Sequence, residues 1–87
     1  MKVNVLGTEA ACGVSSTNGS NFGKGTCVRL HNSGASARLI SVETSAAALI
    51  GTFTLGAGST VNCSKNPTDE VFAAHAEVLG VSIGIIG

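Results

Sequence analysis

From Thr26 to the end of the chain, short runs of alternating apolar and polar residues are separated by turn signals at a spacing of about 8–12 residues. Alternation of this kind places apolar side chains on one face of a strand, because successive side chains point to opposite faces. The pattern predicts an all-β fold: a small β-sandwich or partly open barrel of about six to seven short strands.

The expected strands and their inward residues are Thr26–Asn32 with Val28 and Leu30, Arg38–Thr44 with Ile40 and Val42, Leu49–Leu55 with Leu49, Phe53 and Leu55, Thr60–Lys65 with Val61 and Cys63, and a last strand with Leu79, Val81, Ile83 and Ile85. Ser41 and Glu43 are expected to face outward. In the last strand Gly80, Ser82 and Gly84 form an outward strip of small residues. A neighbouring subunit or the N-terminal segment is expected to lie on this strip, unless the small residues only avoid crowding at a sheet edge.

Residues 68–75 are ambiguous. Thr68, Asp69 and Glu70 precede Val71 and Phe72 as an N-cap and acidic first turn would precede a short helix. Val71 and Phe72 favour a strand, and the surrounding segments are strands. We expect a strand or an irregular extended segment here, with the helix as the alternative.

The N-terminal part of the chain differs in texture. Residues 1–6 alternate weakly and are expected to form a first strand. Gly7–Gly25 is rich in glycine, serine and asparagine and has no sustained periodicity. Loops of this length in compact domains are usually functional or are ordered by a partner. We therefore expect one domain over residues 1–87, with a strand and a long flexible arm in residues 1–25 and a β-rich core in residues 26–87.

Composition bears on the surface of this domain. Apolar residues make up 44% of the chain and charged residues only 11%, and five basic residues balance five acidic ones. Domains with a net charge near zero tend to self-associate. We expect assembly, with copies of itself or with another protein; a neutral, hydroxyl-rich monomer is the alternative.

Nucleic-acid and membrane functions are not expected. The five basic residues are spread along the chain, and there is no Trp or Tyr for base stacking. The longest mostly apolar stretch, Val78–Ile86, is far shorter than the ~20 residues of a spanning helix. Asn4, Thr8 and Glu9 interrupt any signal-peptide core at the N-terminus.

The cysteines and histidines are not spaced in the sequence as the ligands of a metal site usually are. Cys12, Cys27 and Cys63 contain no CxxC pair, and we expect them to be small core residues with free thiols, with a Cys12–Cys27 bridge as the alternative. His31 and His75 are isolated in the sequence. Together with Cys27 they would form a metal site only if the fold brought them together.

Catalytic motifs are also incomplete. A phosphate-binding loop requires four residues between its two glycines, but only three separate Gly19 from Gly23. Ser15, His75 and Asp69 would supply a Ser-His-Asp set, but Ser15 lacks the strand–turn–helix elbow of a serine hydrolase. Asp69 and Glu70 are adjacent and would point to opposite faces of a strand. We expect no catalytic, cofactor-binding or metal-binding residues.

About two-thirds of the chain resembles small β-sandwich structural proteins of tailed bacteriophages, particularly marine and cyanobacterial ones. The resemblance lies in Val28–Asn32, Arg38–Val42, Ile50–Leu55 and Lys65–Ala73. It implies a non-enzymatic virion protein, assembled in the host cytoplasm, that binds the assembled major capsid protein as a decoration or cement subunit. A head–tail or tail component is the alternative position on such a particle.

Two other classes of function remain as alternatives. A soluble module that binds a ligand such as a host-surface glycan is disfavoured by the absence of Trp and Tyr, on which sugar rings usually stack. A small enzyme would require His31, His75 and Cys27 to converge in space.

Overall fold

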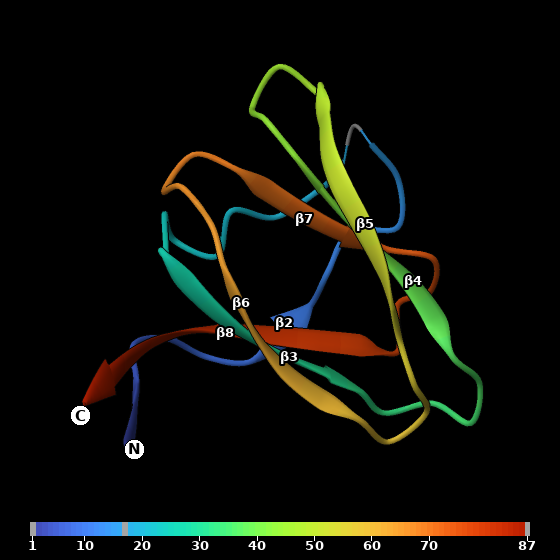
Figure 1. Cartoon of the computed structure of the whole chain (residues 1–87), viewed down its shortest axis with the longest axis horizontal. Coiled ribbons are helices and arrows are strands. Elements are labelled where there is room, and N and C mark those ends of the chain that lie inside the picture. The colour runs from blue at the N-terminus through green and yellow to red at the C-terminus, as the bar shows by residue number, and fades with distance from the viewer. Residues whose placement is uncertain (1, 17, 87) are drawn as a thin grey trace.

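The computed structural model describes residues 2–16 and 18–86, and these contain no helix (Figure 1). Their strands form two antiparallel sheets, which confirms the all-β prediction. The strands are β1 (Lys2–Val5), β2 (Ala10–Ala11), β3 (Cys27–Asn32), β4 (Arg38–Glu43), β5 (Leu49–Leu55), β6 (Thr60–Ser64), β7 (Glu70–Ala73) and β8 (Val78–Ile86).

The larger sheet is organised around β8. Its strand order is β1-β8-β3-β6, and the short β2 also pairs with β8. The smaller sheet has the order β5-β4-β7. Strands from opposite ends of the described chain are therefore neighbours: Lys2 in β1 pairs with Ile86 in β8.

The core receives side chains from both sheets. The predicted inward residues Val28, Leu30 and Ile40 are fully buried, and Leu55 is only 5% exposed. The buried cluster comprises Cys12, Val28, Leu30, Ile40, Leu55, Val71, Ala73 and Val78. Burying these side chains contributes roughly 1.5–3 kcal/mol for each large aliphatic one.

The facing of β8 differs from the prediction. Gly80 pairs with Leu30 and Ser82 with Val28, so the small residues share the core face of the sheet. Val81 and Ile83 lie on the opposite face but are also buried. Both faces of β8 are covered, so the alternation of large and small residues does not indicate which face meets the core.

The N-terminal segment covers part of this small-residue strip, as one of the alternatives expected. A Cβ added at Gly80 would lie 2.6 Å from Phe22 Cζ, so the phenyl ring packs directly against the glycine. The segment is also tied to β8 by backbone hydrogen bonds from Leu6 N to Ser82 O at 2.9 Å and from Cys12 N to Val78 O at 3.1 Å.

A β-bulge changes the facing of Leu49. The register of β4 and β5 shifts between Val42 and Glu43, so Val42 pairs with Gly51 while Glu43 pairs with Leu49. Leu49 therefore leaves the face of Phe53 and is 63% exposed. The expectation that Leu49 points inward is wrong, because a bulge inserts one residue and reverses the facing beyond it.

Ser41 and Glu43 lie on the face of β4 opposite the core, but they are not exposed. Glu43 is 1% exposed and Ser41 6% exposed. Residues of the N-terminal segment cover this face: Ser16 contacts Glu43, and the backbone of Ser20 pairs with Val71 of β7. The predicted exposure of Ser41 and Glu43 is therefore wrong.

Residues 68–75 contain strand β7 and no helix, in agreement with the favoured prediction. A turn precedes the strand, closed by the Asp69 N to Asn66 O hydrogen bond at 3.0 Å. Lys65 lies buried beside it and donates to Asn66 O and Pro67 O. Burial lowers the pKa of Lys65, an effect that the nearby Asp69 opposes.

Candidate interaction surface

The two histidines lie in different parts of the fold and have different partners. His31 lies on the outer face of β3, and its Nδ1 is 2.8 Å from Thr60 Oγ1 on β6. His75 lies in the β7–β8 connection, where its Nδ1 accepts a hydrogen bond from Glu77 N. Among the described residues, no group of three or more His, Cys, Asp or Glu side chains is arranged to hold a metal ion.

Ser15, His75 and Asp69 form hydrogen bonds with neighbours in the sequence and not with one another. Ser15 Oγ accepts a hydrogen bond from Asn18 Nδ2 at 2.9 Å. Asp69 Oδ2 accepts from Asn66 N at 3.2 Å. The structure therefore does not assemble a nucleophile, a base and an orienting acid from these positions.

The three cysteines are free thiols, so the Cys12–Cys27 bridge is absent. Cys12 is buried in the core, and burial raises its pKa to about 11. Burial, with a smaller effect of Cys27, also raises the pKa of Cys63 on β6. Raised pKa values disfavour the reactive thiolate, which is the opposite of what a catalytic cysteine requires.

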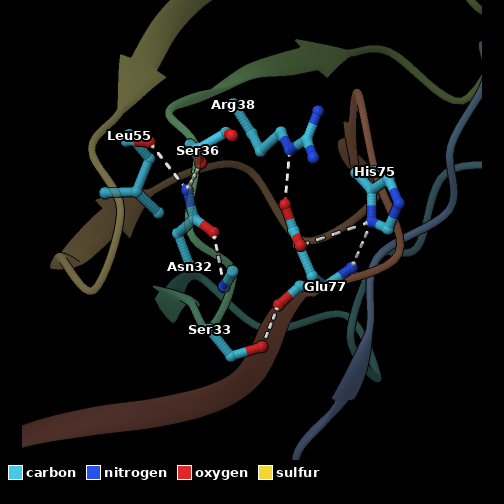
Figure 2. Close-up of polar contacts among 8 residues, drawn as sticks. Asn32, Ser33, Ser36, Arg38, Leu55, His75 and Glu77 are labelled. Atoms are coloured by element: carbon cyan, nitrogen blue, oxygen red, sulfur yellow. Dashed lines mark hydrogen bonds and ion pairs between the residues drawn. The ribbon is translucent and has the colours of Figure 1, made fainter.

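A dense polar network joins the turns at one end of the fold (Figure 2). Asn32 is fully buried at the end of β3, and its Nδ2 donates to Ser36 O at 2.8 Å and to Leu55 O at 3.0 Å. Its Oδ1 accepts from Gly34 N at 3.0 Å. The side-chain amide therefore links the β3–β4 turn to the end of β5.

Glu77 extends this network to the β7–β8 connection. Its carboxylate forms an ion pair with Arg38, and its backbone oxygen accepts from Ser33 Oγ at 2.6 Å (Figure 2). These bonds hold together the β3–β4 turn, the end of β5 and the β7–β8 connection.

A partly open pocket of about 370 Å³ lies where the N-terminal segment crosses β8. Its lining combines one aromatic ring, a few hydroxyl groups and small residues: Leu6, Gly7, Thr8, Ala10, Ser20, Phe22, Gly23 and Ser82. None of these lining residues is acidic or basic, so none of them can act as a general acid or base near neutral pH.

The most conspicuous surface feature is the free edge of β5. Strand β5 is the edge strand of the smaller sheet and pairs only with β4 among the described residues. Its sequence, LIGTFTL, contains no charged residue and no proline. Leu49 and Ile50 at its start are 63% and 56% exposed. Natural edge strands are usually protected from pairing by charges, proline or a covering segment.

Comparison of the edges distinguishes β5 from the others. Strand β1 is only 4 residues long, and the exposed positions of β6 are polar: Thr60, Asn62 and Ser64. The edge of β7 is covered by bridges from Gly13 and Ser20. The bulge lies at the first residues of β5, so the strand from Gly51 to Leu55 is regular. Strand β5 therefore offers the longest uncharged strand edge.

Sequence reasoning missed this feature, as it missed the burial of Glu43 and the role of Asn32. The absence of charge in Leu49–Leu55 was visible, but its position at a sheet edge depends on the order of strands that are distant in sequence. No part of the described chain forms a helix of the length and apolarity needed to cross a membrane.

Comparison with known proteins gives no match. No family model fits the sequence, and neither a curated protein nor a solved structure is significantly similar to the chain.

Proposed function

We propose that the protein is a non-enzymatic virion structural protein, a decoration or cement subunit that binds assembled major capsid protein. The two sheets are taken as the layers of a small β-sandwich, with residues 7–25 as its glycine- and serine-rich loop. The resemblance of Val28–Asn32 and Ile50–Leu55 to phage structural proteins suggests the particle. The free β5 edge is the observation that supports the mode of action.

An unprotected edge strand binds a partner by adding a strand to the sheet. The backbone N–H and C=O groups of β5 supply the hydrogen bonds, and the exposed Leu49 and Ile50 supply apolar contacts. One such contact is weak. On a capsid, however, many neighbouring sites are presented together, and a subunit or oligomer that engages two of them gains avidity.

The first test is the composition of the particle. Mass spectrometry of purified virions produced from the genome that encodes this chain is expected to detect the protein at a stoichiometry comparable to that of the capsid protein. Its absence from the particles would refute the proposal. Its recovery only from isolated tails would move the site to the head–tail or tail region.

The second test addresses β5. Thr52 is exposed in the middle of this strand, so Thr52→Lys places a charge on the edge strand without disturbing the core. We expect at least a tenfold loss of binding to capsids that lack the protein, measured by co-sedimentation. Thr68→Lys, the same substitution at an exposed turn, is the control and should bind normally. Equal binding by both variants would exclude β5 as the docking element.

The pocket beside Phe22 supports a second candidate, a module that binds a small neutral ligand such as a glycan. Its hydroxyl groups and single ring are suited to a sugar, although the ring is half-buried against Gly80. A glycan array with the purified protein tests this candidate, and reproducible binding that Phe22→Ala abolishes would favour it over the virion role.

A further inference from the structure

Glu43 is a buried carboxylate with an incomplete set of partners. Its side chain is 1% exposed, and Ser16 Oγ donates to its Oε2 at 2.7 Å. Its other oxygen, Oε1, is buried and has no hydrogen-bond partner among the described residues. Burying a carboxylate is costly unless it is paired or coordinates a metal, so the unpartnered oxygen calls for an explanation.

A second carboxylate lies on the same side of the sheet. Glu70 of β7 is directly opposite Glu43 of β4 in the strand register. A Cβ added at Gly19 would lie 3.3 Å from Glu43 Oε1 and 3.4 Å from Glu70 Oε1, so both oxygens face the same point of the covering segment. Like charges placed opposite each other on neighbouring strands are destabilising.

No ion pair between described residues relieves this repulsion. The ion pairs between described residues join Arg29 to Glu9 and Arg38 to Glu77, and His75 forms one with Glu77 only when its ring is protonated. Lys65, the one buried lysine of the described chain, donates to backbone oxygens of the turn before β7. Among the described residues, Ser16 Oγ is thus the one hydrogen-bond donor to the two facing carboxylates.

We propose that Glu43 and Glu70 bind one divalent cation, Ca²⁺, beneath the N-terminal segment, with Ser16 Oγ as a further oxygen ligand. All available ligand atoms are oxygens, the type that hard cations prefer. Ca²⁺ accepts irregular arrangements of carboxylate, hydroxyl and water oxygens, whereas Mg²⁺ requires near-ideal octahedral geometry. A Cβ at Gly19 would also lie 3.0 Å from Glu70 Cβ, so the absence of a side chain lets the segment pass close to both carboxylates.

The expected affinity is low. Two carboxylates are fewer than an EF-hand supplies, and sites of low ligand charge have Kd values of about 10⁻⁴–10⁻³ M. The cation would fasten the segment around Ser16 and Gly19 to strands β4 and β7. Binding of this kind is linked to folding, so free Ca²⁺ at about five times Kd is expected to raise Tm by about 4–8 °C.

Isothermal titration calorimetry of the full chain with CaCl₂, at constant ionic strength, tests the proposal together with thermal unfolding. We expect one site per chain, and at least a tenfold weaker Kd in both Glu43→Gln and Glu70→Gln. Glu9→Gln removes the same charge from an exposed carboxylate paired with Arg29, and should retain the affinity of the unchanged protein.

Two outcomes would overturn the site. One is a wild-type protein whose Tm and heat signal respond to CaCl₂ no more than to NaCl. The other is Ca²⁺ binding that Glu9→Gln weakens as much as Glu70→Gln does. Glu70 is only half-buried, so if Glu43→Gln does not fold, the Ca²⁺ affinity of Glu70→Gln is compared with that of Glu9→Gln. Neither outcome depends on whether the protein is part of a virion.

Discussion

At the scale of single residues, the buried side-chain amide of Asn32 stabilises the fold through three hydrogen bonds to the backbone. It satisfies the oxygens of Ser36 and Leu55 and the amide of Gly34, three backbone groups from two separate segments. Such a residue has little tolerance for change, because removing one partner leaves a buried polar group with its full desolvation cost.

Asn32→Asp is expected to destabilise the protein by about 3 kcal/mol or more. The change keeps the shape and one acceptor, but it removes both donated hydrogen bonds and introduces a buried negative charge. Urea unfolding followed by circular dichroism measures the effect. Asn62→Asp, at an exposed position of β6, is the matched control and should change stability by less than about 0.5 kcal/mol. Equal effects would contradict the role of Asn32.

Cys12 gives a pH-dependent stability. Burial raises the pKa of this thiol from its ordinary value of 9.0, which applies to the unfolded chain, to about 11 in the folded chain. Its contribution is therefore fully present below pH 9 and is lost as the pH rises toward 11, because the unfolded chain ionises first.

The stability difference between the wild type and Cys12→Ala should consequently narrow by about 2 kcal/mol between pH 8 and pH 11. Urea unfolding at both pH values measures it, and taking the difference between the two proteins removes the opposing contribution of Lys65. A constant difference would show that the Cys12 thiol ionises equally in both states.

At the scale of elements, β8 can be tested through its glycines. Gly80→Ala would place a Cβ 2.6 Å from Phe22 Cζ and 3.0 Å from Leu30 Cδ2, so the ring must move. We expect a loss of about 1–3 kcal/mol in the free energy of unfolding.

Gly84→Ala in the same strand is the control for this prediction. The new Cβ would meet Leu6 Cδ1 at 3.8 Å, an ordinary contact. Because alanine also restricts the unfolded chain, this variant should be neutral or slightly stabilising. The two variants would behave alike only if Phe22 did not pack against Gly80.

Local pattern was sufficient for several elements. Alternation in Thr26–Asn32 predicted the burial of Val28 and Leu30, and the β-favouring Val71 and Phe72 predicted β7. These residues follow the prediction because one face of each strand meets the core and local propensity agrees with the final structure.

Non-local contacts explain the rest. The facing of Leu49 depends on a bulge that forms only when β4 and β5 pair. The burial of Glu43 depends on Ser16, which lies 27 residues earlier in the sequence. The candidate surface was unpredictable for the same reason. Leu49–Leu55 is an edge strand only because β4 and β7 occupy the other positions of its sheet.

At the scale of the whole molecule, the topology determines how the chain must fold. Strand β8 pairs with β1, β2 and β3, all from the first part of the chain, so the larger sheet cannot form until nearly the whole sequence is brought together. Closing such long loops costs entropy before any contact compensates it.

Refolding is therefore expected to be slow for a chain of this size, in the millisecond-to-second range typical of all-β domains. Stopped-flow circular dichroism after dilution from urea measures it. Microsecond refolding, typical of helical bundles, would contradict the pairing of β1 with β8.

The pairing of Lys2 with Ile86 has a further consequence for the connectivity of the molecule. A short peptide joining the two ends would turn β1 and β8 into a hairpin and close the backbone into a ring. Such a ring would have no end from which an exopeptidase could start. It could then be reopened at the exposed residues 45–48 between β4 and β5, which would give a linear protein with the same sheets and a different order of strands along the chain.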